Sequence, residues 1–371
     1  MLSRLRSSSS NCYFHWCSGA LASIRFQSTF SSVSNLGQSS TNNSANLRVL
    51  DPNQHNKPQI PLVQTVVGKL DINTFRRAAW IPETPLLLRA FHSLPAMNNW
   101  FQNSAGSSPV SFSPSMKPYE DTILPYEFTV SWSSDKPNPN DGVLTEYLNW
   151  LRESSEYRES YLPALIEAVT QSSDRAENPN NPSSFQQFDA PLSLIMSACQ
   201  FNLTRNNSAE RIKRIYVAQS SLSNLPQPLS RDLPTPDIVR HTGKGDIYSS
   251  SIWLGLQPTY TPLHRDPNPN LFCQLVGSKR IRLMTPDRGD EIYARVRREL
   301  GSHGSSRFRG PEMMGGRERE LLHSAVWEGE TVSEVSLSLG DALFIPTGWW
   351  HSVASDGTDG ELNSSVNWWF R

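Results

Sequence analysis

Two residues that can bind a metal ion, His264 and Asp266, lie two positions apart in the segment TPLHRDPNPN. On an extended strand such residues project from the same face, so an imidazole and a carboxylate would meet one ion while Arg265 points away. His351 follows a short apolar strand, Leu343 to Ile345, and a Pro-Thr-Gly turn. Two histidines and one carboxylate that leave other coordination positions open suit non-haem Fe(II), which can then bind O₂ and a cosubstrate.

A closed structural zinc site fits these residues less well. Such sites use four ligands, usually with cysteine, and Cys273 stands alone beside the histidines. The chain has four cysteines, which suggest no disulfide framework. The His-x-Asp pair by itself is a weak pattern, because histidines often have purely structural roles in protein cores.

A lysine in the next hairpin strand, SKRIRLM, gives the pattern more weight. Lys279 shares its face with Ile281 and Leu283, while Arg280 and Arg282 share the other face. The apolar pair marks the inward side, so one lysine points into a core. A buried lysine is costly unless an anion meets it, and the sequence therefore predicts a small anionic ligand near the metal.

These stretches resemble the jumonji-C (JmjC) family of Fe(II)- and 2-oxoglutarate-dependent oxygenases in the cupin superfamily, and most of all its small hydroxylases. The resemblance rests on TPLHRDPNPNLFCQLVGSKRIRL, LSLGDALFIPTGWWHSV and SSVNWWF, with RIYVAQSSL upstream. It covers residues 185–371 in detail. It implies a mainly β fold, a double-stranded β-helix of the jelly-roll (cupin barrel) type with N-terminal helices packed on it.

The resemblance also implies roles for individual residues. His264, Asp266 and His351 match the iron ligands and so form the catalytic centre. Lys279 matches the lysine that pairs with the distal carboxylate of 2-oxoglutarate, and Thr261 matches the hydroxyl donor to the same carboxylate. Further positions that match or border the cosubstrate site are Tyr216, Asn270 and Asn367. The implied cofactors are Fe(II), 2-oxoglutarate as cosubstrate, and O₂.

Composition and hydrophobic periodicity divide the chain into three parts. Residues 1–45 read as a leader, 46–184 as an N-terminal α/β extension with polar loops, and 185–371 as the JmjC catalytic domain. The expected strands are 86–88, 123–132, 214–219, 247–256 and 335–339; the expected helices are 143–152, 161–169, 191–201 and 290–300. The proline-punctuated stretch 225–236 is predicted to be irregular.

The leader is rich in serine and contains Arg4, Arg6 and Arg25, whereas the first acidic residue is Asp51. A segment rich in arginine and serine that lacks acidic residues is typical of a mitochondrial transit peptide. Residues 24–28 resemble the processing site of such a peptide. The sequence therefore predicts that the protein is located in the mitochondrial matrix. A disordered tail, with a cytoplasmic or nuclear location, and a secretory signal are the alternatives.

The net charge of −1 gives no reason to expect a nucleic-acid or membrane partner. Residues 287–322 are rich in arginine, which has two interpretations. One is a recognition segment for an acidic peptide or a phosphate-bearing polymer such as RNA. The other is a solvated helix and loop whose glutamates offset the charge.

The sequence thus predicts a 2-oxoglutarate-dependent dioxygenase, most simply a hydroxylase of protein or peptide side chains in mitochondria. The same chemistry could instead serve a demethylase or a tRNA-modifying oxygenase. A cupin-like binding protein without catalysis is the third alternative. Neither the substrate nor the oligomeric state can be read from these patterns.

Overall fold

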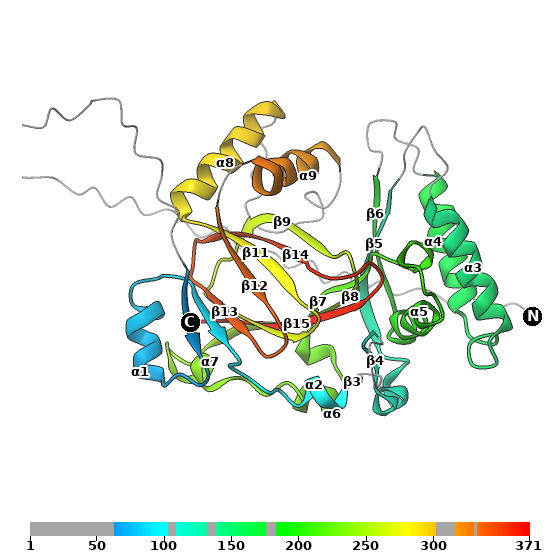
Figure 1. Cartoon of the computed structure of the whole chain (residues 1–371), viewed down its shortest axis with the longest axis horizontal. Coiled ribbons are helices and arrows are strands. Elements are labelled where there is room, and N and C mark those ends of the chain that lie inside the picture. Colours follow the sequence, from blue (N-terminus) through cyan, green and yellow to red (C-terminus); the bar gives the residue numbers. More distant parts are fainter. Residues whose placement is uncertain (1–62, 103–108, 132–138, 176–182, 302–315, 330–331) are drawn as a thin grey trace, which may run out of the picture. The chain divides into compact units, whose positions relative to one another are not determined.

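Two mainly antiparallel sheets carry the residues singled out above (Figure 1). The strands of the C-terminal half are β8 (Ile247–Leu256), β9 (Tyr260–Arg265), β10 (Asn270–Val276), β11 (Lys279–Met284), β12 (Ser333–Leu337), β13 (Ala342–Ile345), β14 (Trp350–Ser355) and β15 (Leu362–Phe370). One sheet contains the order β13-β10-β15-β8 and the other is β12-β11-β14-β9. The chain crosses between the sheets at nearly every turn, which is the connectivity of a jelly roll. The predicted fold class is confirmed.

The structure is a computed structural model, and it describes residues 63–102, 109–131, 139–175, 183–301, 316–329 and 332–371. The predicted leader, residues 1–45, lies outside the described residues. The described residues all belong to one compact unit. No helix in the described ranges combines the length and apolarity needed to cross a membrane.

Apolar side chains from both sheets fill the space between them. Ile281 and Leu283 of β11 meet Phe272 of β10 and Leu343 of β13 in one buried cluster. Along β11 every second residue is buried, and Arg280 lies on the outer side. This alternation is the period-2 pattern of a strand with one apolar face, and it turns Lys279 inward as predicted.

The first sheet continues beyond the jelly roll on both sides to give nine strands. On one side lie β7 (Ile215–Ser221), β5 (Ile123–Ser131) and β6 (Ser183–Pro191), and on the other β2 (Leu86–Arg89) and β1 (Gln64–Val67). The expected boundary between residues 184 and 185 falls inside β6, which pairs with β5 along its length. The N-terminal extension therefore shares a sheet with the jelly roll.

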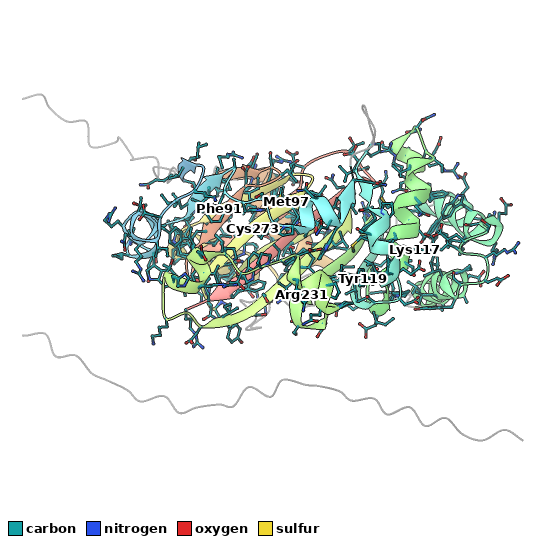
Figure 2. All side chains as sticks on the ribbon, turned by 90° about the horizontal axis from the view of Figure 1, so that it is seen from below. Phe91, Met97, Lys117, Tyr119, Arg231 and Cys273 are labelled. Atoms are coloured by element: carbon teal, nitrogen blue, oxygen red, sulfur yellow. The ribbon has the colours of Figure 1, made fainter. Side chains whose placement is uncertain are left out.

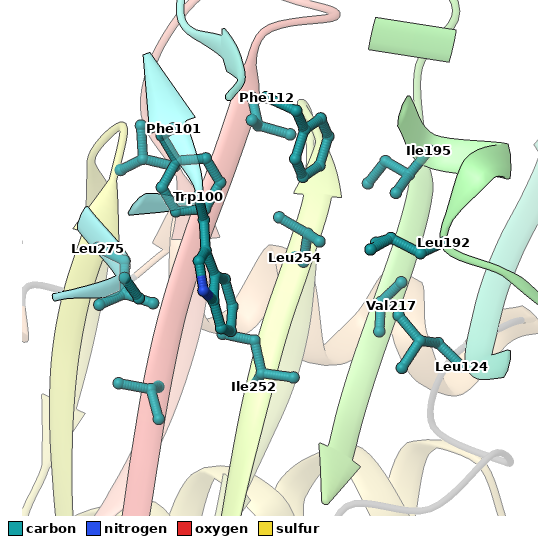
Figure 3. Close-up of a cluster of buried hydrophobic side chains, with 14 of the residues drawn as sticks. Trp100, Phe101, Phe112, Leu124, Leu192, Ile195, Val217, Ile252, Leu254 and Leu275 are labelled. Carbon is teal, nitrogen blue, oxygen red and sulfur yellow. The ribbon is translucent and has the colours of Figure 1, made fainter. Parts of the chain in front are cut away.

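The outer face of the large sheet is covered by N-terminal elements. Trp100, Phe101 and Phe112 lie in one buried cluster with Ile252 and Leu254 of β8 (Figure 3). The helices on this side include α3 (Pro139–Glu153), α4 (Leu162–Arg175) and α5 (Ser193–Leu203). The shorter elements are α1 (Ile72–Phe75), η1 (Arg76–Trp80), α2 (Ala96–Asn99), β3 (Phe101–Gln102), β4 (Ser111–Phe112), η2 (Pro114–Tyr119), η3 (Ser208–Glu210), η4 (Leu222–Asn224), α6 (Gln227–Arg231) and α7 (Asp237–His241).

Most of the predicted elements have counterparts in the structure. The prediction that 225–236 is irregular is wrong in part, because α6 forms there. Pro228 stands in the first turn of α6, where a proline costs no intrahelical hydrogen bond. The helix expected at 290–300 is α8 (Pro286–Glu299), followed by α9 (Gly316–His323) and η6 (Ser324–Gly329). These three elements pack on the outside of the four-stranded sheet through Leu263, Met284 and Trp350.

Candidate metal and cosubstrate site

The three predicted metal ligands come together at neighbouring strands. His264 lies on β9 and is paired in register with His351 on β14, and Asp266 directly follows β9. One potential ligand atom from each of His264, Asp266 and His351 lies within 4.8 Å of the others. The Nε2 atom of His351 is 3.6 Å from Oδ2 of Asp266, and the two imidazole rings are 4.2 Å apart.

Backbone carbonyls fix both imidazoles in the form that binds a metal. The Nδ1 atom of His264 lies 2.8 Å from the carbonyl oxygen of Pro262, and that of His351 lies 3.3 Å from the carbonyl oxygen of Trp349. A carbonyl oxygen can only accept a hydrogen bond, so each Nδ1 must carry the hydrogen. The Nε2 atoms then carry the lone pairs that could bind an ion, an arrangement common to metal-binding histidines.

A chain of two amides holds the carboxylate of Asp266. The Nδ2 group of Asn270 donates to Oδ2 of Asp266 at 2.9 Å, and the Nδ2 group of Asn367 donates to Oδ1 of Asn270 at 2.9 Å. An ionised carboxylate only accepts, so it sets the direction of both bonds. Asn270 and Asn367 therefore support a metal ligand, whereas their expected contacts to the cosubstrate remain predictions.

Lys279 lies inside the jelly roll with only 2 % of its surface exposed. Its Nζ atom donates to Oγ of Ser365 at 3.1 Å and lies 5.7 Å from the ring centre of Tyr216 and 5.3 Å from that of Phe272. None of the described carboxylates forms an ion pair with it. Burial lowers the pKa of Lys279 to about 7, because a low-dielectric environment disfavours the charged ammonium.

Thr261 also faces the interior. It pairs in register with Val353 of β14, and Val353 belongs to the cluster between the sheets. Directly opposed residues share a face, so Thr261 points to the same side as Val353. In a regular strand, residues three apart face opposite sides, so Thr261 and His264 would not share a face. They can both face inward because the register of β9 and β14 shifts between His351 and Val353.

Two residues near Lys279 did not emerge from the sequence pattern. Ser365 stands two residues before Asn367 on β15, and Phe272 two residues after Asn270 on β10. The period-2 rule applied to these two strands would have found both. Cys273, which is labelled in Figure 2, is fully buried and belongs to the cluster on the other face of its sheet. It is not among the residues whose potential ligand atoms come together, and burial raises the pKa of its thiol.

The fold and the site together define a cupin-type protein with two histidines and a carboxylate in the geometry that suits Fe(II). A family model described as a cupin-like domain matches residues 72–371, and the chain belongs to this family.

Similar curated proteins carry JmjC names. A stretch of 166 residues is 30 % identical to lysine-specific demethylase JMJ31 of Arabidopsis thaliana, covering 43 % of this chain and 28 % of that protein. Lysine-specific demethylase 8 of Danio rerio is 31 % identical over 157 residues, 42 % of this chain and 36 % of that protein. JmjC domain-containing protein D of Dictyostelium discoideum is 26 % identical over 166 residues, 42 % of this chain and 36 % of that protein. The chain thus spans about a third of the length of these relatives.

The resemblance to JmjC proteins is therefore confirmed. JmjC oxygenases use Fe(II), 2-oxoglutarate and O₂, and the side chains present fit the first two. The imidazole and carboxylate donors suit iron, and the inward lysine offers the cation that a dicarboxylate needs.

Proposed function

We propose that this protein is an Fe(II)- and 2-oxoglutarate-dependent oxygenase that hydroxylates a side chain of a protein substrate in mitochondria. The observation that carries the proposal is the pairing, inside one jelly roll, of the triad His264, Asp266 and His351 with the buried Lys279. A metal alone would not need the lysine, and an anion alone would not need the triad.

When bound, Fe(II) supplies the activation of O₂: one oxygen atom enters a substrate C–H bond, the other enters succinate, and the carboxyl carbon of 2-oxoglutarate leaves as CO₂. The chain contributes orientation. Lys279 and Thr261 hold the distal carboxylate of the cosubstrate. The rings of Tyr216 and Phe272 beside Lys279 exclude water, which strengthens the charge interaction.

A hollow of about 270 Å³ on the large sheet is the feature that favours a substrate with a cationic side chain. Its lining includes Glu127, which is only 6 % exposed, and the exposed Asp189. Glu127 pairs in register with Tyr216, so both face the same side of the sheet. The hollow therefore adjoins the Tyr216 side of the cosubstrate pocket, and its carboxylates favour a lysine or arginine side chain.

Demethylation is a second candidate, because relatives are named lysine-specific demethylases. Hydroxylation of an N-methyl carbon requires the same site, and the same carboxylates suit an alkylated ammonium. An RNA substrate has less support. Arg297 pairs with Glu318 at 2.9 Å and Arg317 lies 3.4 Å from Glu299, so these pairs neutralise much of the charge of α8 and α9.

The mitochondrial location rests on residues 1–45 alone. Their serine and arginine content without acid supports import into the matrix. Fusion of these residues to a fluorescent protein should direct it to mitochondria, and replacement of Arg4, Arg6 and Arg25 by glutamate should abolish this. A diffuse signal from the unaltered fusion would contradict the location without affecting the chemistry.

The reaction itself is tested by conversion of 2-oxoglutarate to succinate with Fe(II) under air, with and without lysine- and arginine-containing peptides. The protein should produce succinate, and its His264→Ala variant should not. Stimulation by a peptide, with a gain of one oxygen atom on that peptide, would identify a hydroxylase. Loss of a methyl group as formaldehyde would identify a demethylase. Absence of both metal and 2-oxoglutarate binding would instead indicate a cupin-like binding protein.

A further inference from the structure

The residues beside the metal ligands point outward and contact each other. Arg265 lies between His264 and Asp266, and Trp350 directly precedes His351. Arg265 and Trp350 are register partners on β9 and β14, and the guanidinium carbon of Arg265 lies 5.4 Å from the Trp350 ring centre. The inward ligand pair is thus backed by an outward pair on the same two strands.

Helix α8 covers this outward pair at very short range. Asp290 Oδ1 lies 3.5 Å from Nη1 of Arg265, and the ring of Tyr293 lies 5.1 Å from that of Trp350. At Gly289 the helix backbone itself rests on the indole. A Cβ atom there would lie 2.0 Å from Cγ of Trp350, a separation that no real contact allows. Trp350 is 0 % exposed beneath it.

Helix propensity does not explain this glycine, because glycine in a helix interior is less favourable than alanine. The ion pair between Arg265 and Asp290 adds little stability either. The two side chains are 22 % and 46 % exposed, and ion pairs as exposed as this contribute little to the free energy of unfolding. Both features do set where β9 and β14 lie relative to α8. The two strands that carry His264 and His351, with Asp266 directly after β9, are therefore held from behind.

We propose that α8 is a positioning element for the metal centre, acting through Gly289 on Trp350 and through Asp290 on Arg265. This inference rests on the proposed metal centre. Groups that orient metal ligands typically change metal affinity by about 10–100-fold when altered. We expect Gly289→Ala to fall in this range, because the helix must move away from the strand that carries His351. We expect a smaller loss, about three- to tenfold, for Asp290→Asn.

The test measures Mn²⁺ and Co²⁺ affinity of the full chain, together with the visible spectrum of the Co²⁺ form, which reports ligand geometry. Gly142→Ala is the matched control for Gly289→Ala, since Gly142 lies in α3 with open space around it. Glu291→Gln is the control for Asp290→Asn, because Glu291 pairs with Arg288 on the same helix. Asp290→Glu should restore the affinity that Asp290→Asn loses.

Lower metal affinity and an altered Co²⁺ spectrum in Gly289→Ala, with both controls unchanged, would support the inference. A folded Gly289→Ala protein with unchanged affinity and spectrum would overturn it. If Gly289→Ala does not fold, the comparison of Asp290→Asn with Asp290→Glu decides in the same way. If the unaltered protein binds neither ion, the metal centre itself is contradicted, which is a distinct outcome.

Discussion

The metal end and the lysine end of the pocket are built on different principles. At the metal end the chain supplies the orienting partners: carbonyl oxygens accept from His264 and His351, and the amide of Asn270 holds Asp266. At the lysine end, Lys279 has a serine hydroxyl and two rings around it but no carboxylate ion pair among the described residues. The first end is organised before any ligand arrives, whereas the second needs an anion from outside.

The largest effect should come from breaking the metal end. His351→Ala removes one of three ligands, and we expect stoichiometric iron binding and all succinate formation to be lost. Elemental analysis and the succinate assay measure both. His241→Ala is the matched control, because its ring is exposed on α7. Iron-dependent turnover that persists in His351→Ala would show that the triad is not the metal site.

Breaking the lysine end should leave the metal end intact. Lys279→Met removes the cation but keeps an apolar stem. We expect 2-oxoglutarate affinity to fall roughly 30- to 5,000-fold, since a lost partner of a buried charge pair costs about 2–5 kcal/mol. Metal affinity should be unchanged. Calorimetric titration measures both constants, with the outward Arg280→Met as control. Equal loss of metal binding would mean that the two ends are not separable.

The pKa of Lys279 predicts a pH dependence of stability without ligand. The folded pKa is lowered to about 7 from 10.5, so between these values the unfolded chain binds one more proton than the folded one. The free energy of unfolding should therefore rise with pH in this window, by up to about 1.4 kcal/mol per pH unit. Below pH 7 the destabilisation is fully present.

Urea unfolding of the metal-free protein and of Lys279→Met at several pH values from 6 to about 10 isolates this contribution. The difference in stability between the two proteins should favour Lys279→Met most at low pH and shrink as pH rises. A difference that does not change with pH would assign Lys279 an ordinary pKa, and with it an acidic partner.

Within the pocket, the smallest effect should come from the amide chain of Asn270 and Asn367. Asn367→Ala leaves Asn270 without its donor, so Asp266 is held less firmly, and we expect about a tenfold loss of metal affinity. If Asn367 serves only the cosubstrate, the variant will bind metal normally and 2-oxoglutarate more weakly. Measuring both affinities separates these roles.

Strand periodicity predicted much of this site because a period of two fixes which side chains share a face. That rule placed His264 with Asp266 and turned Lys279 inward. It could not derive Thr261, which stands three residues from His264 and depends on a register shift between β9 and β14.

The covering helix could be predicted only in part. Its existence follows from the sequence, but the role of Gly289 does not, because that depends on which indole lies beneath it. The amide chain was equally hidden, since Asn270 and Asn367 lie on different strands, 97 residues apart. Contacts between distant segments are set by packing, which local patterns do not report.

The most direct test of the two-ended pocket is a calorimetric titration of 2-oxoglutarate, with Mn²⁺ present throughout, into the unaltered protein, His351→Ala, Lys279→Met and the double variant. We predict one site per chain in the unaltered protein, weak binding in each single variant, and none in the double variant. Unchanged 2-oxoglutarate affinity in both single variants would contradict a pocket that joins a metal to Lys279.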